Sequence, residues 1–214
     1  MWVKICGITR REDALLAAGL GAEAIGFVFW PASRRFIRPI EAKAIARGLP
    51  ASVTAVGVFV DQPFEHVSAI ARLVGLGAVQ LHGYESAEYC SHLTAPIIKA
   101  VALGEGFRLS AIANLPPALT ILLDAADSSM HGGTGRTIDW TMANQVARTR
   151  RTILAGGLTP ANVADAIRAV RPYGVDVSSG VERSPGVKYK DRLRRFLEAV
   201  RACGAGANGD EGAD

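Results

Sequence analysis

Eight short apolar runs alternate with helix-length amphipathic segments along this chain, and this alternation constrains the fold more than any other feature. The runs are rich in Val, Ile, Leu and Phe and are nearly continuous in their apolar character. Such runs are typical of parallel strands that are covered on both faces. We expect strands at 2 to 6, 24 to 29, 53 to 60, 78 to 81, 97 to 101, 119 to 123, 152 to 155 and 174 to 177.

The segments between these runs predict helices. Two of them begin with a clear signal, because Gln62-Pro63 and Thr159-Pro160 place a proline in the first helical turn, where its missing N–H costs nothing. The predicted helices are Asp13 to Ala18, Pro39 to Ala46, Pro63 to Val74, Ser86 to Leu93, Gly106 to Ala113, Asp139 to Val146, Pro160 to Val170 and Tyr189 to Val200.

Regular repetition of strand and helix requires a parallel sheet, and eight strands can close that sheet into a barrel. We therefore predict an α/β fold, a single (β/α)8 TIM barrel over residues 1 to 202, and a chain of 214 residues is long enough for one. The alternative is an open doubly wound sheet. That fold usually carries a GxGxxG turn after its first strand, and Cys6-Gly7-Ile8-Thr9 is not such a turn.

The last residues, 203 to 214, have almost nothing to bury, and we expect them to form a disordered tail in which Cys203 lies near solvent and does no chemistry. No apolar run reaches the roughly 18 residues that a membrane span needs, and the amino terminus has no secretory signal. Three cysteines, at 6, 90 and 203, form neither a disulfide framework nor a CxxC metal clip. A cytoplasmic location suits them.

The net charge of +4 and the pI near 9.2 make the chain mildly basic. Its positive residues are scattered apart from two clusters, Arg34-Arg35-Phe36-Ile37-Arg38 and Arg148-Thr149-Arg150-Arg151. A phosphorylated small molecule suits this charge as well as nucleic acid does. We expect such a substrate, with no nucleic-acid or membrane partner, and either a monomer or a homodimer.

The active site of such a barrel is assembled at the carboxyl ends of the strands and in the loops after them. Asp176 and His82 lie at such ends, and we expect both to contact the substrate, with ordering of its loop as the alternative role for His82. A glycine-rich loop after the sixth strand is expected to lie over the site; its glycines are Gly132, Gly133 and Gly135.

Two glycine clusters follow the last two strands, Gly156-Gly157 and Ser178-Ser179-Gly180. Backbone N–H groups freed by glycine, helped by serine hydroxyls and by the positive end of a short helix, can hold a phosphate. The alternative is that both clusters are only tight turns. Because they occupy adjacent loops, where such barrels usually bind phosphate, we favour phosphate binding.

Three further residues carry candidate chemistry. Asp124 ends an apolar strand, where partial desolvation would keep it partly protonated as a general acid requires, although a loop-capping role fits equally and Asp127 is a weaker candidate. Cys6 closes the first strand, but free cysteine usually packs as a small hydrophobe. The planar fork of Arg35 suits a carboxylate, with a solvated arginine as the alternative.

Several motifs together resemble the phosphoribosylanthranilate isomerase family of tryptophan biosynthesis, and the resemblance runs from residue 3 to about 200. The motifs are Lys4-Ile5-Cys6-Gly7-Ile8-Thr9, Val56-Gly57-Val58-Phe59-Val60, Val79-Gln80-Leu81-His82-Gly83, Leu122-Leu123-Asp124, Gly132-Gly133-Thr134-Gly135, Leu154-Ala155-Gly156-Gly157-Leu158 and Val175-Asp176-Val177-Ser178-Ser179-Gly180-Val181-Glu182.

This resemblance implies an Amadori rearrangement of N-(5-phospho-β-D-ribosyl)anthranilate to 1-(2-carboxyphenylamino)-1-deoxy-D-ribulose 5-phosphate, without metal or organic cofactor. By motif, Cys6 corresponds to the family's general base and Asp124 to its general acid. Arg35 fits the arginine that holds the anthranilate carboxylate better than Arg34 does. The chain departs from the commonest form of this loop at Trp30-Pro31-Ala32 and at Arg38, which affects substrate contacts rather than the reaction.

A base role requires Cys6 to be partly a thiolate, which Lys4, Arg35 or the helix after Gly7 would support and a bound phosphate would oppose. Competing interpretations are a bifunctional isomerase that also serves histidine biosynthesis, a metal-dependent pentose-phosphate epimerase, and a barrel that only binds a metabolite or a protein. The first would end its first strand in aspartate, and the second would need more strand-end histidines than His82.

Overall fold

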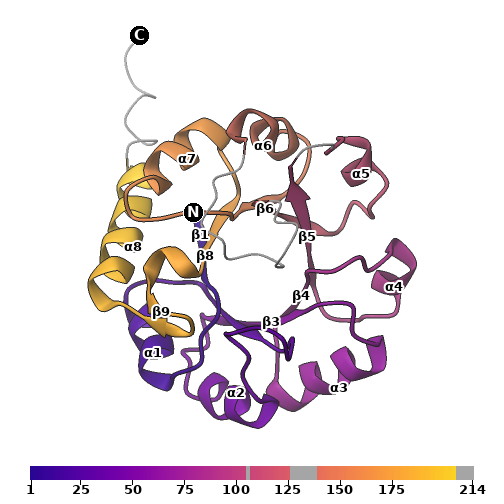
Figure 1. The fold of residues 1–214 in the computed structure, drawn as a ribbon, viewed down its shortest axis with the longest axis vertical. Helices are drawn as coiled ribbons and strands as arrows, with labels where there is room; N and C mark the ends of the chain where they lie inside the picture. The colour runs from indigo at the N-terminus through magenta and orange to yellow at the C-terminus, as the bar shows by residue number, and fades with distance from the viewer. Residues whose placement is uncertain (105–106, 126–138, 206–214) are drawn as a thin grey trace.

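In the computed structural model of this chain, eight parallel strands form a barrel in sequence order, which the pairing of the last strand with the first closes (Figure 1). The structure describes residues 1–104, 107–125 and 139–205. The barrel strands are β1 (Trp2–Ile5), β2 (Ala24–Val28), β3 (Thr54–Phe59), β4 (Ala78–Leu81), β5 (Ile97–Leu103), β6 (Thr120–Ala125), β7 (Thr152–Leu154) and β8 (Gly174–Val177).

Helices surround this barrel on its outside, one after each strand (Figure 1). They are α1 (Arg11–Gly19), α2 (Pro39–Ala46), α3 (Phe64–Val74), α4 (Ala87–Ser91), α5 (Ser110–Ala113), α6 (Trp140–Ala147), α7 (Val163–Val170) and α8 (Lys190–Ala205). The predicted (β/α)8 barrel is therefore confirmed, and the open sheet is excluded. In the part of the chain that the structure describes, no helix combines the length and the apolar character needed to cross a membrane.

Several helix ends differ from the predictions, among them the start of α7 and the end of α8. α7 begins at Val163 rather than at Pro160, because the side chain of Asn162 accepts a hydrogen bond from the backbone N–H of Thr159 and holds the preceding residues in a turn. α8 continues to Ala205, so the predicted boundary at residue 202 falls inside a helix. Cys203 is partly buried against the core, which favours this extension over the exposed position that we expected. Residues 206–214 lie outside the described part.

The side chains of each strand point alternately into the barrel and towards the helices. In β1, Val3 and Ile5 belong to the core between barrel and helices, and Lys4 and Cys6 accordingly point inwards. Small and medium apolar side chains fill the interior: Ala24, Val56, Ala78, Ile98, Ala100, Leu122, Ile153 and Ala155. Above them a second cluster of Cys6, Val28 and Val58, with Trp30 packed against it, lies at the carboxyl end of the strands.

A short antiparallel hairpin follows β8 and was not predicted. It consists of β9 (Glu182–Ser184) and β10 (Val187–Lys188), preceded by a single 3-10 turn, η1 (Ser179–Val181). The hairpin packs on the loop after β1, because Thr9 Oγ1 donates to the carbonyl of Gly186 at 2.6 Å and Asp13 accepts from the backbone of Lys188 at 3.0 Å. Strands this short show no period in a sequence, but their contacts bring Glu182 and Lys188 to the barrel mouth.

Gly180 keeps the loops after β7 and β8 in contact. A Cβ atom at this position would lie 1.9 Å from the carbonyl oxygen of Leu158, which is backbone and cannot rotate away. We expect Gly180→Ala to lower the free energy of unfolding by about 1 to 3 kcal/mol, the usual cost of overpacking. Urea denaturation followed by fluorescence measures this change.

Gly19 provides the matched control, because it lies in α1 and a Cβ atom there would meet nothing within 4 Å. Replacing a helical glycine by alanine in open space stabilises a protein by roughly 0.5 to 1 kcal/mol. If Gly180→Ala were as stable as Gly19→Ala, the close approach of the two loops would not be a property of the protein in solution.

Candidate active site

A pocket opens at the carboxyl ends of the barrel strands and collects most of the predicted site residues. Cys6, Arg35 and Asp124 all line it, although they come from the ends or loops of β1, β2 and β6. Its complete lining is Cys6, Val28, Trp30, Ala32, Ser33, Arg34, Arg35, Val58, Val60, Gln80, His82, Asp124, Asp176 and Ser178. Residues that are far apart in sequence therefore share one solvent-connected cavity.

The lining of this pocket combines apolar and polar side chains. Val28, Trp30, Val58 and Val60 present hydrocarbon and aromatic surface, and other lining residues carry carboxylates, an imidazole and arginines. Pockets of this composition bind ligands with an apolar body, which a few fixed polar groups orient. A flat ring that bears an anionic group and a polar chain matches both kinds of side chain.

Cys6 has 8% of its surface exposed, so its thiol reaches the pocket while most of it is buried. Burial disfavours the charged form and raises the pKa of Cys6, although the neighbouring positive charges of Lys4 and Lys188 oppose this effect. Asp176 adds to the rise. In the free protein Cys6 is therefore mainly a thiol, and the partial thiolate that a base requires is not the resting state.

Lys4 and Asp176 form a buried ion pair directly on the barrel interior. They are register partners on β1 and β8, and Lys4 Nζ lies 2.8 Å from Asp176 Oδ2. Lys4 has no exposed surface, whereas Asp176 reaches the pocket. The second oxygen of Asp176 is buried and has no hydrogen-bond partner among the described residues, so its hydrogen-bonding capacity is not used within them.

His82 connects Gln80 to Asp124. His82 Nε2 lies 3.4 Å from Asp124 Oδ2, and its Nδ1 lies 3.1 Å from Gln80 Nε2. An amide that donates to Nδ1 leaves the ring proton on Nε2, where it faces the carboxylate. Asp124 itself is 7% exposed and lies on β6, as its position after an apolar run predicted. His82 thus contacts the proposed acid as well as the pocket.

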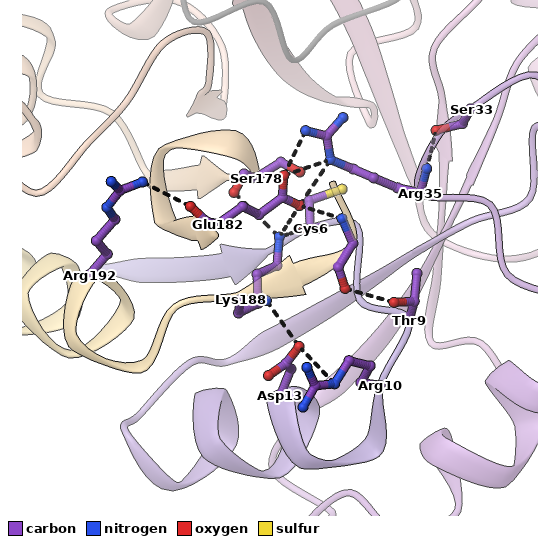
Figure 2. Close-up of polar contacts among 11 residues, drawn as sticks. Cys6, Thr9, Arg10, Asp13, Ser33, Arg35, Ser178, Glu182, Lys188 and Arg192 are labelled. Carbon is purple, nitrogen blue, oxygen red and sulfur yellow. Dashed lines mark hydrogen bonds and ion pairs between the residues drawn. The ribbon is translucent and has the colours of Figure 1, made fainter. Parts of the chain in front are cut away.

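Arg35 is already paired in the structure, which the sequence did not indicate. Its Nε and Nη2 donate to the carboxylate of Glu182 at 2.9 and 2.7 Å, respectively (Figure 2). This contact orients the guanidinium plane and leaves Nη1 outside the Glu182 contact. Burial alone would raise the pKa of Glu182, but the hydrogen bonds from Arg35 and the charge of Lys188 outweigh it and hold that pKa below its ordinary value.

Lys188 connects the hairpin to the end of β1. Its buried ammonium donates to the carbonyls of Cys6 and Ser178 at 2.5 and 3.3 Å and to Glu182 Oε1 at 2.8 Å (Figure 2). Sequence reasoning assigned no role to Glu182 or Lys188. The one available signal was Ser184-Pro185-Gly186, a turn-forming triplet between two charged residues. The triplet indicates a hairpin without indicating where the hairpin packs.

A second cavity adjoins the first on the side of β7 and β8. Asp124, Asp176 and Ser178 line both cavities, so the two are parts of one site. The rest of its lining is Ala155, Gly156, Gly157, Leu158, Val177 and Ser179. The residues that we predicted to bind phosphate thus line this cavity, with one exception. Gly180 does not line the cavity, and its contact with Leu158 explains why it is a glycine.

The glycines of this second cavity adopt the conformation that an anion site needs. Gly156 and Gly157 have φ values of 76° and 66°, in the left-handed region that turns successive backbone N–H groups to one side. Asn162 Nδ2 donates to the carbonyl of Gly157 at 3.0 Å and fixes the turn. Ser178 Oγ is buried and has no hydrogen-bond partner in the described residues. These groups provide hydrogen-bond donors on the side of the cavity formed by the loops after β7 and β8.

Some predicted residues lie outside the described residues: Asp127, Gly132, Gly133, Thr134 and Gly135. The glycine loop expected over the site therefore stays a prediction. Within residues 1–104, 107–125 and 139–205, no three His, Cys, Asp or Glu side chains form a cluster that would hold a metal ion.

Comparison with known sequences identifies relatives over nearly the whole chain. Residues 3–199 match the family model of N-(5′-phosphoribosyl)anthranilate (PRA) isomerase. A protein of this name from Trichlorobacter lovleyi is 48% identical over 205 residues, which cover 93% of this chain and 97% of the relative. One from Pelobacter propionicus is 46% identical over 199 residues, covering 93% and 95%.

Solved structures give the same result. The phosphoribosyl anthranilate isomerase of Thermotoga maritima has a TM-score of 0.88 at 42% identity, and the match covers 94% of this chain and 99% of that one. A second structure, in complex with reduced 1-(o-carboxyphenylamino)-1-deoxyribulose 5-phosphate, has a TM-score of 0.85 at 40% identity, with coverage of 94% and 99%.

Proposed function

The chain belongs to the N-(5′-phosphoribosyl)anthranilate isomerase family, and we propose that Cys6 and Asp124 are the general base and general acid of its reaction. The enzyme converts N-(5-phospho-β-D-ribosyl)anthranilate into 1-(2-carboxyphenylamino)-1-deoxy-D-ribulose 5-phosphate, an Amadori rearrangement in tryptophan biosynthesis. The observation that carries the residue assignment is that the thiol and the carboxyl group line one pocket, beside a cavity with the features of a phosphate site.

Asp124 acts in the first step. Its carboxylic acid donates a proton to the ring oxygen of the ribose, and the C1′–oxygen bond breaks to give a protonated Schiff base between C1′ and the anthranilate nitrogen. Asp124 suits this step because it lines both cavities, between the space for the ring and the space for the phosphate. His82, which faces Asp124 Oδ2, holds the carboxyl group in place.

Cys6 acts in the second step, in which its sulfur takes the proton from C2′. The electron pair of that C–H bond forms the C1′–C2′ double bond of an enolamine and neutralises the Schiff base, and tautomerisation then gives the ketone. Burial raises the pKa of Cys6 in the free enzyme, so only the fraction of enzyme that carries the thiolate takes the proton from C2′.

The two ends of the substrate occupy the two cavities in this proposal. The anthranilate ring lies against Val28, Trp30 and Val58, with its carboxylate near the guanidinium of Arg35. The phosphate accepts hydrogen bonds from the loops that contain Gly156, Gly157, Ser178 and Ser179, and Gly180 allows those loops to meet. Asp176 accepts a hydrogen bond from a sugar hydroxyl.

The proposed site is built from the residues of one chain, so it is compatible with both a monomer and a homodimer. A relative from Thermotoga maritima is described as dimeric. All three cysteines are free, which suits a reducing compartment, and we propose that the enzyme works in the cytoplasm on its phosphorylated substrate, without a nucleic-acid or membrane partner.

A turnover assay tests this function. Phosphoribosylanthranilate is fluorescent and is made in the cuvette from anthranilate by the preceding transferase. Addition of the purified protein should make the fluorescence decay at a rate proportional to enzyme concentration, and the product should be the ribulose phosphate. If no protein concentration accelerates the decay, the barrel binds its ligand without converting it.

Arg35→Ala should weaken binding of the carboxylate-bearing substrate by about 1.5 to 3 kcal/mol, the scale of a charge-assisted hydrogen bond. Glu182 keeps Lys188 and the N–H of Gly186 as partners in this variant, so the loss reports on the substrate. The measurement is KM for the natural substrate and for an analogue without the carboxylate. Wild type should discriminate between the two, and Arg35→Ala should not.

Arg34→Ala is the control for this variant, because Arg34 is the exposed neighbour of Arg35 on the same loop. The assignment of Arg35 is wrong if Arg34→Ala abolishes the discrimination and Arg35→Ala retains it.

A further inference from the structure

Lys4 is a fully buried cation that the proposed mechanism does not use. It lies on the same inward face of the first strand as Cys6, two residues earlier, and therefore one layer deeper in the barrel. A lysine in such a place is rare, because removing an ammonium from water costs several kcal/mol unless other charges compensate. Its burial therefore requires negative charges close to the ammonium.

Gly26 on β2 opens the space in which Lys4 and Cys6 approach each other. A Cβ atom at Gly26 would lie 2.9 Å from Cys6 Sγ and 3.0 Å from Lys4 Cε. Both side chains thus border the same small space. Cys6 Sγ therefore lies no more than about 6 Å from Lys4 Cε, the carbon that bears the ammonium, and charges at such a range change each other's ionisation.

Asp176 compensates Lys4 only in part. The two lie 2.8 Å apart, yet Lys4 Nζ has no well-aligned hydrogen bond in the described part of the chain. A buried ammonium with unsatisfied donors is stabilised by any further negative charge beside it. A thiolate at Cys6 would supply that charge, since Cys6 and Lys4 border the same small space next to Gly26.

We propose that Lys4 is a positioning residue whose buried ammonium stabilises the thiolate of Cys6, and that its partner Asp176 opposes that effect. The proposal rests on the role of Cys6 as the base and adds a group that makes the role feasible in a buried site. Lys4 touches no substrate and acts through the thiol alone.

The electrostatic influences on Cys6 agree with this assignment. After burial, which raises the pKa of Cys6, Lys4 is the largest influence and lowers it, and Asp176 is the next and raises it. Lys188 also lowers it. The other titratable or charged groups at the mouth of the barrel are Arg34, Arg35, His82, Asp124 and Glu182. Substitution of Lys4 or Asp176 leaves all of these groups in place.

The test measures the rate at which iodoacetamide alkylates Cys6 as a function of pH, quantified by mass spectrometry of the peptide that contains it. Lys4→Met keeps the length of the side chain and removes the charge. At a fixed pH below the midpoint of the Cys6 titration, this variant should slow alkylation by about 10- to 1000-fold. The reason is that the loss of a nearby opposite charge moves a pKa by roughly 1 to 3 units. Asp176→Asn should accelerate alkylation.

The distinguishing result is that the two substitutions change the alkylation rate of Cys6 in opposite directions. If Lys4 and Asp176 had only a structural role, the loss of either one would change that rate in the same direction. Same-direction changes, or wild-type alkylation in Lys4→Met, would overturn the proposal. Should Lys4→Met fail to fold, the double variant Lys4→Met/Asp176→Asn leaves no unpaired buried charge. Its alkylation should be slower than wild type, and an equal or faster rate counts against Lys4.

The alkylation rate of Cys6 is measured without turnover. It therefore tests the role of Lys4 separately from the role of Cys6 as the base. If Cys6→Ala retained normal kcat while Lys4→Met slowed alkylation, Lys4 would control the thiol but the thiol would not be the base. If Cys6→Ala lost activity and Lys4→Met alkylated normally, the base would be correct and the role of Lys4 wrong.

Discussion

Cys6→Ala is expected to lower kcat by about 10² to 10⁴, the usual contribution of a positioned acid or base, with a smaller change in substrate affinity. The reason is that alanine leaves the pocket, the ring contacts and the phosphate loops in place but provides no group to take the proton from C2′. The fluorescence assay measures kcat and KM for wild type and variant under identical conditions.

Cys203→Ala is the control, because Cys203 lies in α8 and does not line either cavity. Its kcat should equal that of wild type. Near-normal turnover in Cys6→Ala would remove the thiol from the mechanism, and a fall in kcat of similar size in Cys203→Ala would mean that cysteine loss acts through folding instead.

Asp124→Asn is expected to have an effect of similar size, about 10² to 10⁴ in kcat. Asparagine has nearly the same shape and keeps an oxygen for the contact with His82, but it has no acidic proton to give to the ring oxygen. The loss should therefore appear in kcat, with KM changed much less. Single-turnover measurements at saturating enzyme separate this chemical step from product release.

Asp165→Asn is the matched control for that variant, because Asp165 is exposed on α7, where it pairs with Arg168 on the same helix. It should leave kcat and KM unchanged. If Asp124→Asn instead raised KM and left kcat intact, Asp124 would bind the substrate without protonating it.

The fold was predictable from the sequence because a parallel barrel imposes one pattern throughout. The strands 78 to 81 and 174 to 177 are mostly apolar and buried, and both were predicted with the bounds that the structure has. The ends of helices were harder to predict than the strands, since each end depends on a few individual contacts. Asn162 delays the start of α7, and α8 continues past its predicted end with Cys203 packed against the core.

The positions of Cys6, Asp124 and Asp176 were also predictable, since the carboxyl ends of all barrel strands meet at one mouth. The partner of Arg35 was not. Glu182 lies 147 residues further along the chain and reaches Arg35 through a hairpin whose strands have only two and three residues. No periodicity exists in so short a segment, and long-range pairing of this kind depends on tertiary packing.

The protonation of Cys6 could not be predicted either, because it depends on opposing influences. The sequence showed that Lys4 and Arg35 are available as positive charges, but not that burial would have the largest effect on the thiol. That effect depends on the exposure of the thiol in three dimensions. It matters for the proposed mechanism, since a thiol that burial keeps protonated has to lose its proton before it can act as the base.

The most direct test of the central claim is the kinetic isotope effect with substrate deuterated at C2′. In the proposed mechanism Cys6 removes that proton, whereas Asp124 promotes the ring opening that precedes it. Cys6→Ala should therefore show a large primary isotope effect on kcat, and Asp124→Asn should show an effect near unity because ring opening limits its rate. The reverse pattern would contradict the assignment of base and acid.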